Sequence, residues 1–365
     1  MLGQHGDLRP NSSNPTSQLP NPISQNKNNT IMKAHQKPRP SFSGSRSVPG
    51  YGNAQENTEA EGAKNPRSHG LGCHLKLTLA TYNARSLSSE ARFLELEEEL
   101  EKINWDIVGL SEVRRRGEEL IELKSGHLFY YRGSECGTTG GVGFIVNKKL
   151  KNNVREIDST SNRVARLVIE LSQRYKLQVI QAYAPTSSHS EEEVEEFYEE
   201  IRELNNRQNN HVKIIMGDFN ARIGQQEANE KSVGKFGYGD RDERGHLLVE
   251  YAEAEKMYIM NSFFKKKPHR KWTWRHPNGR TSEIDYIMSN RRYVIEDCNV
   301  LNRFNTGSDH RMVRCKLHLN TRLERRKLVR GHKQVEKKLL QQQREVFQLE
   351  LKNRFAALDE DMDIS

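Results

Sequence analysis

Short apolar runs bounded by turn residues recur between Leu75 and Leu319, and this pattern predicts a series of buried β-strands. The predicted strands cover residues 75–83, 106–112, 141–147, 164–171, 177–184, 212–220, 271–275, 283–289 and 311–319. Strands outnumber the helical segments between them, and short turns join several of them. We therefore predict a sheet-rich α/β (α+β) layer architecture rather than a strict βαβ repeat.

Three segments between these runs have the apolar spacing of α-helices. The first covers residues 88–103 and places four apolar side chains among acidic ones: Leu94, Leu96, Leu100 and Ile103. Ser190 opens a second helix, and Glu193 three residues later completes a capping-box pattern. A third helix is expected over residues 243–256.

Composition divides the chain into three regions. Residues 1–72 are rich in Pro, Ser, Asn and Gln, and they cannot bury enough apolar surface to offset chain entropy, so we expect a disordered tail. Residues 73–320 are expected to form the folded domain. Residues 321–365 indicate a basic linker and then an amphipathic helix, with apolar side chains at Leu340, Phe347, Leu351, Phe355 and Leu358. This helix could contact a protein partner through residues 335–358 or could cap the core.

The formal net charge of +9 lies mostly outside the predicted domain. Basic and acidic residues number 8 and 4 in the first 72 residues, 8 and 2 in 321–338, and 3 and 6 in the last 27, which leaves +2 for 73–320. We therefore expect the two basic segments to supply much of any nonspecific affinity for a polyanion. Within the domain, binding would depend on local patches such as Arg114–Arg116 and Lys265–Lys271, each of which could equally be a solvated loop.

The cysteine pattern and the apolar runs indicate the compartment. Cys73, Cys136, Cys298 and Cys315 are far apart and form no C-x-x-C pair, so they predict reduced thiols rather than a zinc site or a disulfide framework. The chain has no apolar segment near its start and no run of eighteen apolar residues. We expect neither a signal peptide nor a membrane span, and an intracellular protein.

Polar side chains lie at the ends of several predicted strands, where a rigid scaffold can hold them beside a substrate. They are Asn83, Glu112, Tyr183, Asp218, Asn220, Asp285 and the segment Gly307–His310. Each one alone could be a cap or a turn residue. Together they combine the oxygen ligands that Mg²⁺ prefers with a histidine that can transfer a proton near neutral pH. The set predicts metal-assisted phosphoryl transfer to water.

Six motifs carry a family resemblance, and they occur in order as YNARSL, DIVGLSE, AYAPT, GDFNAR, IDYI and SDH. The series resembles the signature of the endonuclease/exonuclease/phosphatase superfamily over residues 75–320. Within that superfamily, YNARSL, FIVN, YAPT, GDFNA, the WTW strand and IDYI most closely resemble the endonuclease domain of LINE-type retrotransposons, a pattern shared by craniofacial development protein 2-like proteins. The resemblance implies a two-layer β-sandwich of mixed sheets flanked by helices, with the site at one edge.

The resemblance also implies a Mg²⁺-dependent endonuclease that nicks DNA and leaves a 3′-hydroxyl. Glu112 would hold Mg²⁺, or Mn²⁺, with help from Asn83, and Asp309 would lie near that metal site. Asp218 would orient or deprotonate the attacking water. These four residues would therefore supply the metal centre and the base.

Four further residues would act on the phosphate by the same resemblance. Asn220 and Tyr183 would bind the scissile phosphate and its developing charge. His310 would hydrogen-bond a phosphoryl oxygen, and Asp285 would fix the histidine ring.

Three residues would contact the substrate directly. Arg85 stands where abasic-site repair members of the superfamily have an acidic metal-site residue, so abasic-site repair is disfavoured. The arginine could contact a phosphate or pair with a carboxylate. Thr273 lies where the family reads DNA beside the site, although it could equally be an ordinary β-branched strand residue. Ser308, in the SDH motif, is also assigned to substrate binding.

Two other functions remain open at this stage. The same fold could hydrolyse another phosphoester, such as a phosphoinositide, sphingomyelin or RNA, or the chain could be a non-catalytic remnant that binds DNA or chromatin. The sequence contains no reverse-transcriptase aspartate pair after the predicted nuclease, so a reverse transcriptase or an RNA-protein partner would act in trans. We expect a nuclear or cytoplasmic location and favour the nucleus. The segment KKKPHRK over residues 265–271 could act as a nuclear-localisation signal or contact DNA phosphates, and it could equally be a charged hairpin before the WTW strand.

Overall fold

The computed structural model describes residues 74–137, 139–172, 175–207, 212–320 and 341–349. The tail expected over residues 1–72 and the basic segment 321–338 lie outside the described residues. Of the predicted C-terminal helix, only residues 341–349 are described, and they are helical. None of the described helices is both long and apolar enough to cross a membrane.

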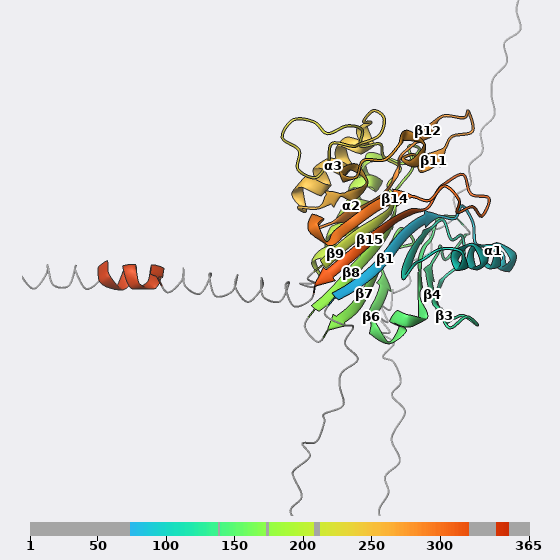
Figure 1. Cartoon of the computed structure of the whole chain (residues 1–365), viewed down its shortest axis with the longest axis horizontal. Coiled ribbons are helices and arrows are strands. Elements are labelled where there is room, and N and C mark those ends of the chain that lie inside the picture. Colours follow the sequence, from blue (N-terminus) through green and yellow to red (C-terminus); the bar gives the residue numbers. More distant parts are fainter. Residues whose placement is uncertain (1–73, 138, 173–174, 208–211, 321–340, 350–365) are drawn as a thin grey trace, which may run out of the picture. The chain divides into compact units, whose positions relative to one another are not determined.

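Two mixed β-sheets form the centre of the domain (Figure 1). The seven-stranded sheet has the order β14 (Ile295–Val300), β15 (Val313–Asn320), β1 (His74–Asn83), β2 (Ile107–Ser111), β5 (Val142–Val146), β4 (Leu128–Arg132) and β3 (Glu118–Glu122). The six-stranded sheet has the order β10 (Tyr258–Ile259), β13 (Asp285–Ser289), β9 (Val212–Asp218), β8 (Tyr175–Tyr183), β7 (Val164–Ser172) and β6 (Val154–Ser159). Within these sheets β1–β2 and β8–β9 are parallel pairs and the other pairs are antiparallel.

The two sheets pack face to face around one apolar cluster that draws side chains from both, such as Leu79 and Phe144 from one sheet and Val179 and Ile214 from the other. Burying this surface is the main favourable contribution to folding. Many of these strands are buried on both faces because helices cover the outer faces, so their sequences are almost continuously apolar. The predicted two-layer β-sandwich of mixed sheets flanked by helices is confirmed.

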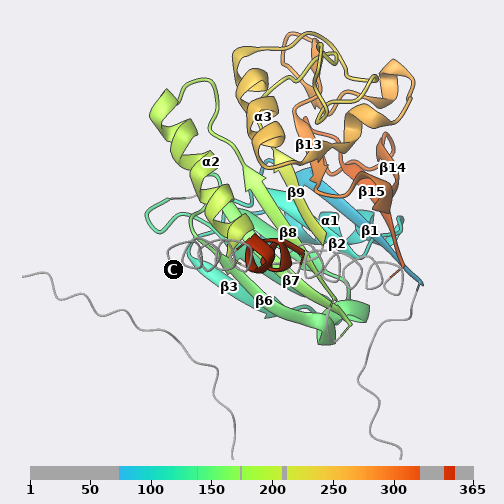
Figure 2. The same ribbon diagram turned by 90° about the vertical axis from the view of Figure 1, so that its left-hand side faces the viewer.

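Three helices cover the outer faces of the sandwich (Figures 1 and 2). Helix α1 (Glu90–Glu101) packs on the seven-stranded sheet, and α2 (Glu191–Asn206) and α3 (Glu243–Ala254) pack on the six-stranded sheet. The predicted capping box is present at α2, where Ser190 and Glu193 each accept the other's backbone N–H.

The prediction of which residues form the apolar face of the first helix is partly wrong. Leu94 is 51% exposed, whereas Phe93, which the spacing did not include, is 2% exposed and packs against the ring of Phe129. Leu96 and Leu100 are buried as expected. The aromatic partner on β4 therefore sets which side of the helix faces the sheet.

Several short strands were not predicted, and one predicted strand is shorter than expected. Strands β3 and β6 are edge strands with mostly exposed or half-buried residues, so they lack the apolar run that identifies a buried strand. In the expected strand over 271–275, only Trp274–Arg275 pairs; it forms β11 of a separate hairpin with β12 (Thr281–Ser282). Short 3₁₀ turns η1 (Lys148–Asn153), η2 (Met260–Phe263), η3 (Pro268–Arg270) and η4 (Arg292–Val294) complete the connections.

Candidate active site

The ends of four strands meet at one edge of the sandwich. Asn83, Tyr183 and Asp218 are the last residues of β1, β8 and β9, and Glu112 directly follows β2. The register pairs Tyr183 with Asp218 and Asp218 with Asp285. Because β13 is antiparallel to β9, the first residue of β13 lies beside the last residue of β9. Four of these predicted site residues are thus positioned by strand pairing, and the fifth, Glu112, directly follows a paired strand.

The buried side chain of Asn83 joins the two sheets across this edge. Its Nδ2 donates to Oε1 of Glu112 at 2.9 Å and to Oδ2 of Asp218 at 2.9 Å. Its Oδ1 accepts from the backbone N–H of Arg85 at 2.8 Å, so the amide is fixed in orientation. An amide nitrogen has two protons, and both are used here. Asn83 therefore sets the spacing between a carboxylate from each sheet.

Asp218, Asp285 and His310 form a compact buried group. They are 1%, 0% and 8% exposed. Nδ1 of His310 lies 3.0 Å from Oδ2 of Asp285, and its Nε2 lies 3.9 Å from Oδ2 of Asp218. One ligand atom from each residue lies within 4.8 Å of the other two. Asp285 thus orients the imidazole, and the other ring nitrogen faces the carboxylate predicted to activate water.

Burial and mutual charge shift the protonation of this group. Burial raises the pKa of Asp218 to about 7, the charge of Asp285 adds to the rise, and His310 and Asn83 oppose it. Burial alone would lower the pKa of His310, but the charge and hydrogen bond of Asp285, and then the charge of Asp218, raise it to about 9. Between these values a deprotonated carboxylate and an imidazolium coexist, which is the pairing that base and electrophile roles require.

Two further side chains hold Asp285 in place. The hydroxyl of Thr273 accepts from the backbone N–H groups of Ile284 at 3.0 Å and Asp285 at 3.1 Å. Thr273 is fully buried, so its hydroxyl holds the backbone of Asp285 from inside the protein. Nδ2 of Asn261 donates to the backbone oxygen of Asp285 at 3.0 Å. Sequence reasoning missed Asn261, because it lies in a short 3₁₀ turn and follows no apolar run.

Glu112 lies in a more open environment than the aspartates, with 15% of its side chain exposed. Its Oε2 accepts from Nη2 of Arg114 at 2.5 Å and from Nε at 3.2 Å. Both residues have positive φ, 54° for Glu112 and 51° for Arg114, in the left-handed region that non-glycine residues rarely adopt. The sequence placed Arg114 in a surface patch. Its separation of two residues from Glu112 was the available signal for an ion pair.

Tyr183 and Asn220 lie at the same edge. Burial, and then the negative charges of Glu112 and Asp218, raise the pKa of the Tyr183 phenol, so it remains a neutral donor. Asn220 has φ of 47°, and its backbone N–H donates to Oδ1 of Asp218 at 3.0 Å. Its Nδ2 donates to the backbone oxygen of Ala184 at 2.9 Å, which leaves its second amide proton for a ligand.

The SDH segment closes the site from the side of β15. Ser308 donates from Oγ to the backbone oxygen of Asn83 at 2.8 Å and accepts from the backbone N–H of His310 at 3.0 Å. Oδ2 of Asp309 accepts from the indole N–H of Trp274 at 3.2 Å. Ser308 therefore ties the segment to β1. Arg85 is exposed, has φ of 60°, and pairs with no acidic side chain among the described residues.

The donor set fits a hard divalent cation. The carboxylates of Glu112 and Asp218 accept from the same Asn83 amide, and Asp285 pairs with Asp218 across the strands. Carboxylate oxygens are the preferred ligands of Mg²⁺. Oδ1 of Asp285 is buried and has no hydrogen-bond partner in the described part of the chain. Buried polar atoms normally have a partner, so the site has more acceptor capacity than the protein itself uses. Of the predicted metal residues, Glu112 and Asp309 are half-buried, whereas Asn83 is buried.

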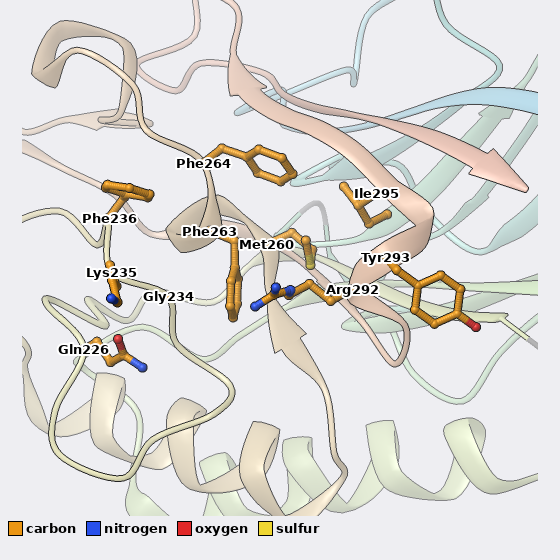
Figure 3. Close-up of a pocket in the computed structure, with 10 residues that line it drawn as sticks. All are labelled: Gln226, Gly234, Lys235, Phe236, Met260, Phe263, Phe264, Arg292, Tyr293 and Ile295. Atoms are coloured by element: carbon orange, nitrogen blue, oxygen red, sulfur yellow. The ribbon is translucent and has the colours of Figure 1, made fainter.

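Hollows elsewhere in the described part of the chain lie outside this constellation. One, of about 460 Å³, is lined by ten residues that include Phe236, Phe263, Arg292 and Tyr293, and none of the predicted site residues lines it (Figure 3). In the close-up the Arg292 guanidinium lies against the Phe263 ring, 5.1 Å from its centroid. A second hollow of about 720 Å³ lies between the end of α1 and the loops 268–270 and 301–304.

Comparison with curated proteins finds related sequences. The chain is 32% identical over 256 residues to "Craniofacial development protein 2" of Bos taurus and 31% identical over 256 residues to the protein of that name from Tragulus javanicus. Each match covers 69% of this chain but only 42% and 44% of the relatives. The chain thus spans less than half the length of these curated relatives.

Two solved structures illustrate the structural likeness. The endonuclease domain of TRAS1, a telomere-specific non-LTR retrotransposon, is 13% identical with a TM-score of 0.46, covering 68% of this chain and 100% of that one. The AP endonuclease LMAP from Leishmania major is 12% identical with a TM-score of 0.49, covering 66% of this chain and 87% of that one.

The family model "Endonuclease/Exonuclease/phosphatase family" matches residues 80–310. This span runs from within β1 to His310, so it includes the six-stranded sheet, the seven-stranded sheet apart from β15 and the start of β1, and the converging strand ends. The family's members are hydrolytic phosphoesterases that generally depend on a divalent metal. By this match the chain belongs to the endonuclease/exonuclease/phosphatase family.

Proposed function

We propose that this chain is a Mg²⁺-dependent endonuclease that nicks DNA by water attack on the scissile phosphate. The observation that carries the proposal is the buried group of Asp218, Asp285 and His310, joined through Asn83 to the accessible carboxylate of Glu112. This arrangement supports the assignment of a base, an oriented imidazole and a cation-binding carboxylate to one cluster. Phosphoryl transfer depends mainly on such positioning and charge stabilisation.

Asp218 is the base in this mechanism. Its pKa of about 7 lets it accept a proton near neutral pH, while hydrogen bonds from Asn83 and from the Asn220 backbone hold both carboxylate oxygens. The water proton passes to Asp218 as the water oxygen attacks phosphorus. The bond between phosphorus and the 3′ oxygen breaks, and that oxygen takes a proton from solvent to become a hydroxyl.

The remaining residues bind the phosphate. Protonated His310 donates from Nε2 to a non-bridging oxygen, because Asp285 occupies Nδ1. The phenol of Tyr183 and the second amide proton of Asn220 donate to the same group. A divalent cation held by Glu112, with Asn83 and Asp309 beside it, would neutralise the charge that develops on the phosphate. Arg114 holds the same Glu112 carboxylate on its solvent side.

DNA is favoured as the substrate by the motifs that this chain shares with LINE-type endonuclease domains. Arg85 lies at the exposed rim beside Asn83, where it is free to contact a phosphate. We propose in addition that the protein acts in the nucleus and that a reverse transcriptase or RNA-protein partner acts in trans. Thr273 would influence the DNA contact through Asp285, whose backbone it holds.

A plasmid assay tests the proposal. Supercoiled DNA incubated with the purified full chain and Mg²⁺ or Mn²⁺ should convert to open circles, and excess chelator should abolish the conversion. The nicked product should be extended by a DNA polymerase without further treatment, since its 3′ end is a hydroxyl. Hydrolysis of phosphoinositide, sphingomyelin or poly(A) without DNA nicking would replace the proposed substrate. Nicking that persists in excess chelator would remove the metal from the mechanism.

A further inference from the structure

Two guanidinium groups lie over one indole ring beside the site. The Cζ atom of Arg311 is 3.2 Å from the ring centroid of Trp272, and the Cζ atom of Arg275 is 5.3 Å from it. Nη1 of Arg311 also donates to the backbone oxygen of His269 at 3.0 Å and to Oδ1 of Asn302 at 3.3 Å. An arginine held in this way has already lost much of its rotamer freedom, so it is preorganised to bind an anion.

Neither arginine is neutralised by a carboxylate. Within the described part of the chain, no acidic side chain lies within 4.0 Å of Arg275 or Arg311, nor of the exposed Arg270 and Arg303. His269, Arg270, Asn302 and Arg303 line the 720 Å³ hollow. We call Arg270, Arg275, Arg303 and Arg311 the unpaired arginine cluster. Its charge is unpaired, unlike that of Arg114, which is bound to Glu112.

The cluster adjoins the catalytic group through backbone pairing. The backbone N–H of Arg311 donates to the oxygen of Thr273 at 2.6 Å, and that of Arg275 donates to the oxygen of Asp309 at 3.0 Å. Arg311 directly follows His310, and successive side chains of extended backbone point in opposite directions. Arg311 therefore lies next to the site rather than inside it, where the nucleic acid flanking a scissile phosphate would pass.

We propose that the unpaired arginine cluster binds backbone phosphates of duplex DNA on one side of the scissile bond. This inference rests on the proposed function, since it assigns a further contact surface to the same substrate. Guanidinium groups bind phosphate oxygens through two parallel hydrogen bonds. Arg270 and Arg303 line the hollow, and Arg275 and Arg311 lie over Trp272 beside the site, so the cluster offers several contacts to a repeating polyanion. The domain as a whole has little net charge, so this local surface would supply the orientation of DNA across the site.

Salt dependence of binding tests the proposal with the full chain. The double variant Arg275→Gln/Arg311→Gln is compared with the wild type by fluorescence anisotropy on a short duplex in chelator, which prevents cleavage. Each neutralised phosphate contributes about 0.9 to the magnitude of the slope of log K against log salt. The slope of the double variant should therefore be shallower than that of the wild type by about 1.8. Its Kd should rise by at least about tenfold at moderate salt.

Two controls separate charge from folding. The pair Arg155→Gln/Arg207→Gln removes the same charge from arginines that are ion-paired to Glu170, Asp158 and Glu203, and its slope and nicking rate should match the wild type. The pair Arg275→Lys/Arg311→Lys keeps the charge and should keep the slope. If it loses the slope as the glutamine pair does, the effect is structural and the proposal fails.

The remaining outcomes distinguish this proposal from the proposed function. A glutamine pair with the full wild-type slope, in a protein whose wild type nicks plasmid, overturns the arginine surface and leaves the endonuclease intact. A wild type that does not nick DNA overturns the endonuclease itself. Loss of adsorption to phosphoinositide vesicles with unchanged DNA binding would assign the cluster to a lipid headgroup and overturn the proposal.

Discussion

The two halves of the site differ in exposure and in how they are held. The buried half, Asp218, Asp285 and His310, is at most 8% exposed, and paired strands and the segment before β15 supply its residues. The open half consists of Glu112 and Arg114, whose side chains are 15% and 42% exposed. Both lie in the irregular segment after β2, with positive φ. Asn83 hydrogen-bonds to both halves.

This difference predicts that the buried half controls protonation and the open half controls metal binding. In the buried half, neighbouring charges act through little water, so protonation is set by the protein, as the raised pKa values of Asp218 and His310 show. In the open half, solvent weakens the Arg114–Glu112 ion pair and allows a cation to compete for the carboxylate. We therefore expect changes in the buried half to alter the chemical step and changes in the open half to alter metal affinity.

The largest effect is expected for Asp218→Asn. The amide keeps the shape of the side chain but cannot accept the proton of the attacking water, so kcat for nicking should fall by about 10²–10⁴. Affinity for duplex DNA should stay within about threefold, because the base contacts water rather than phosphate. Single-turnover cleavage and anisotropy measure the two quantities. A loss of binding equal to the loss of rate would show that Asp218 is structural.

Glu112→Gln should act on the metal. Removing the charged oxygen ligand should raise the Mg²⁺ concentration needed for half-maximal nicking by on the order of 100-fold, with part of the rate recovered at saturating metal. A Mg²⁺ titration of the nicking rate measures this. Glu118→Gln is the matched control, because this β3 glutamate pairs with Arg132, outside the site, and should leave the titration unchanged. An unshifted titration for Glu112→Gln would place the metal elsewhere.

Asp285→Asn should shift both limbs of the pH–rate profile, which report the protonation of Asp218 and His310. In the wild type, activity should rise as Asp218 loses its proton near pH 7 and fall as the His310 imidazolium loses its proton near pH 9. Without the charge of Asp285, which raises both pKa values, both limbs should move to lower pH, the basic one by about 1–2 units.

Histidine NMR of the metal-free protein and the pH–rate profile both report this change. Asp285→Asn should lower the His310 pKa in the NMR titration by a shift similar to that of the basic limb. A slower enzyme with unmoved limbs would mean that Asp285 only orients the ring.

The sequence predicted most of the buried half and less of the open half. Asn83, Asp218 and Asp285 end or begin apolar runs, and a strand scaffold brings such ends together, so local pattern was sufficient. The spacing of Glu112 and Arg114 allows an ion pair, but the pair also depends on positive φ at both residues, which no residue pattern there specifies. Lys271, expected in a solvated basic patch, is buried, and its ammonium group binds the backbone oxygens of Phe236 and Asn261. The contacts of Lys271 join segments distant in sequence, so residue spacing could not predict them.

Arg114→Ala should have the smallest effect, and its sign is informative. The guanidinium occupies Oε2 of Glu112, so its removal should free that oxygen and tighten Mg²⁺ binding. The arginine side chain is 42% exposed, and a pair screened to this degree contributes about 1 kcal/mol or less, which limits the gain to about fivefold. The Mg²⁺ titration of the nicking rate measures the shift. Arg92→Ala, which removes an exposed arginine paired with Glu95, is the matched control and should leave the titration unchanged. Weaker Mg²⁺ binding in Arg114→Ala would contradict the competition and show that the arginine instead holds Glu112 in the geometry that the cation requires.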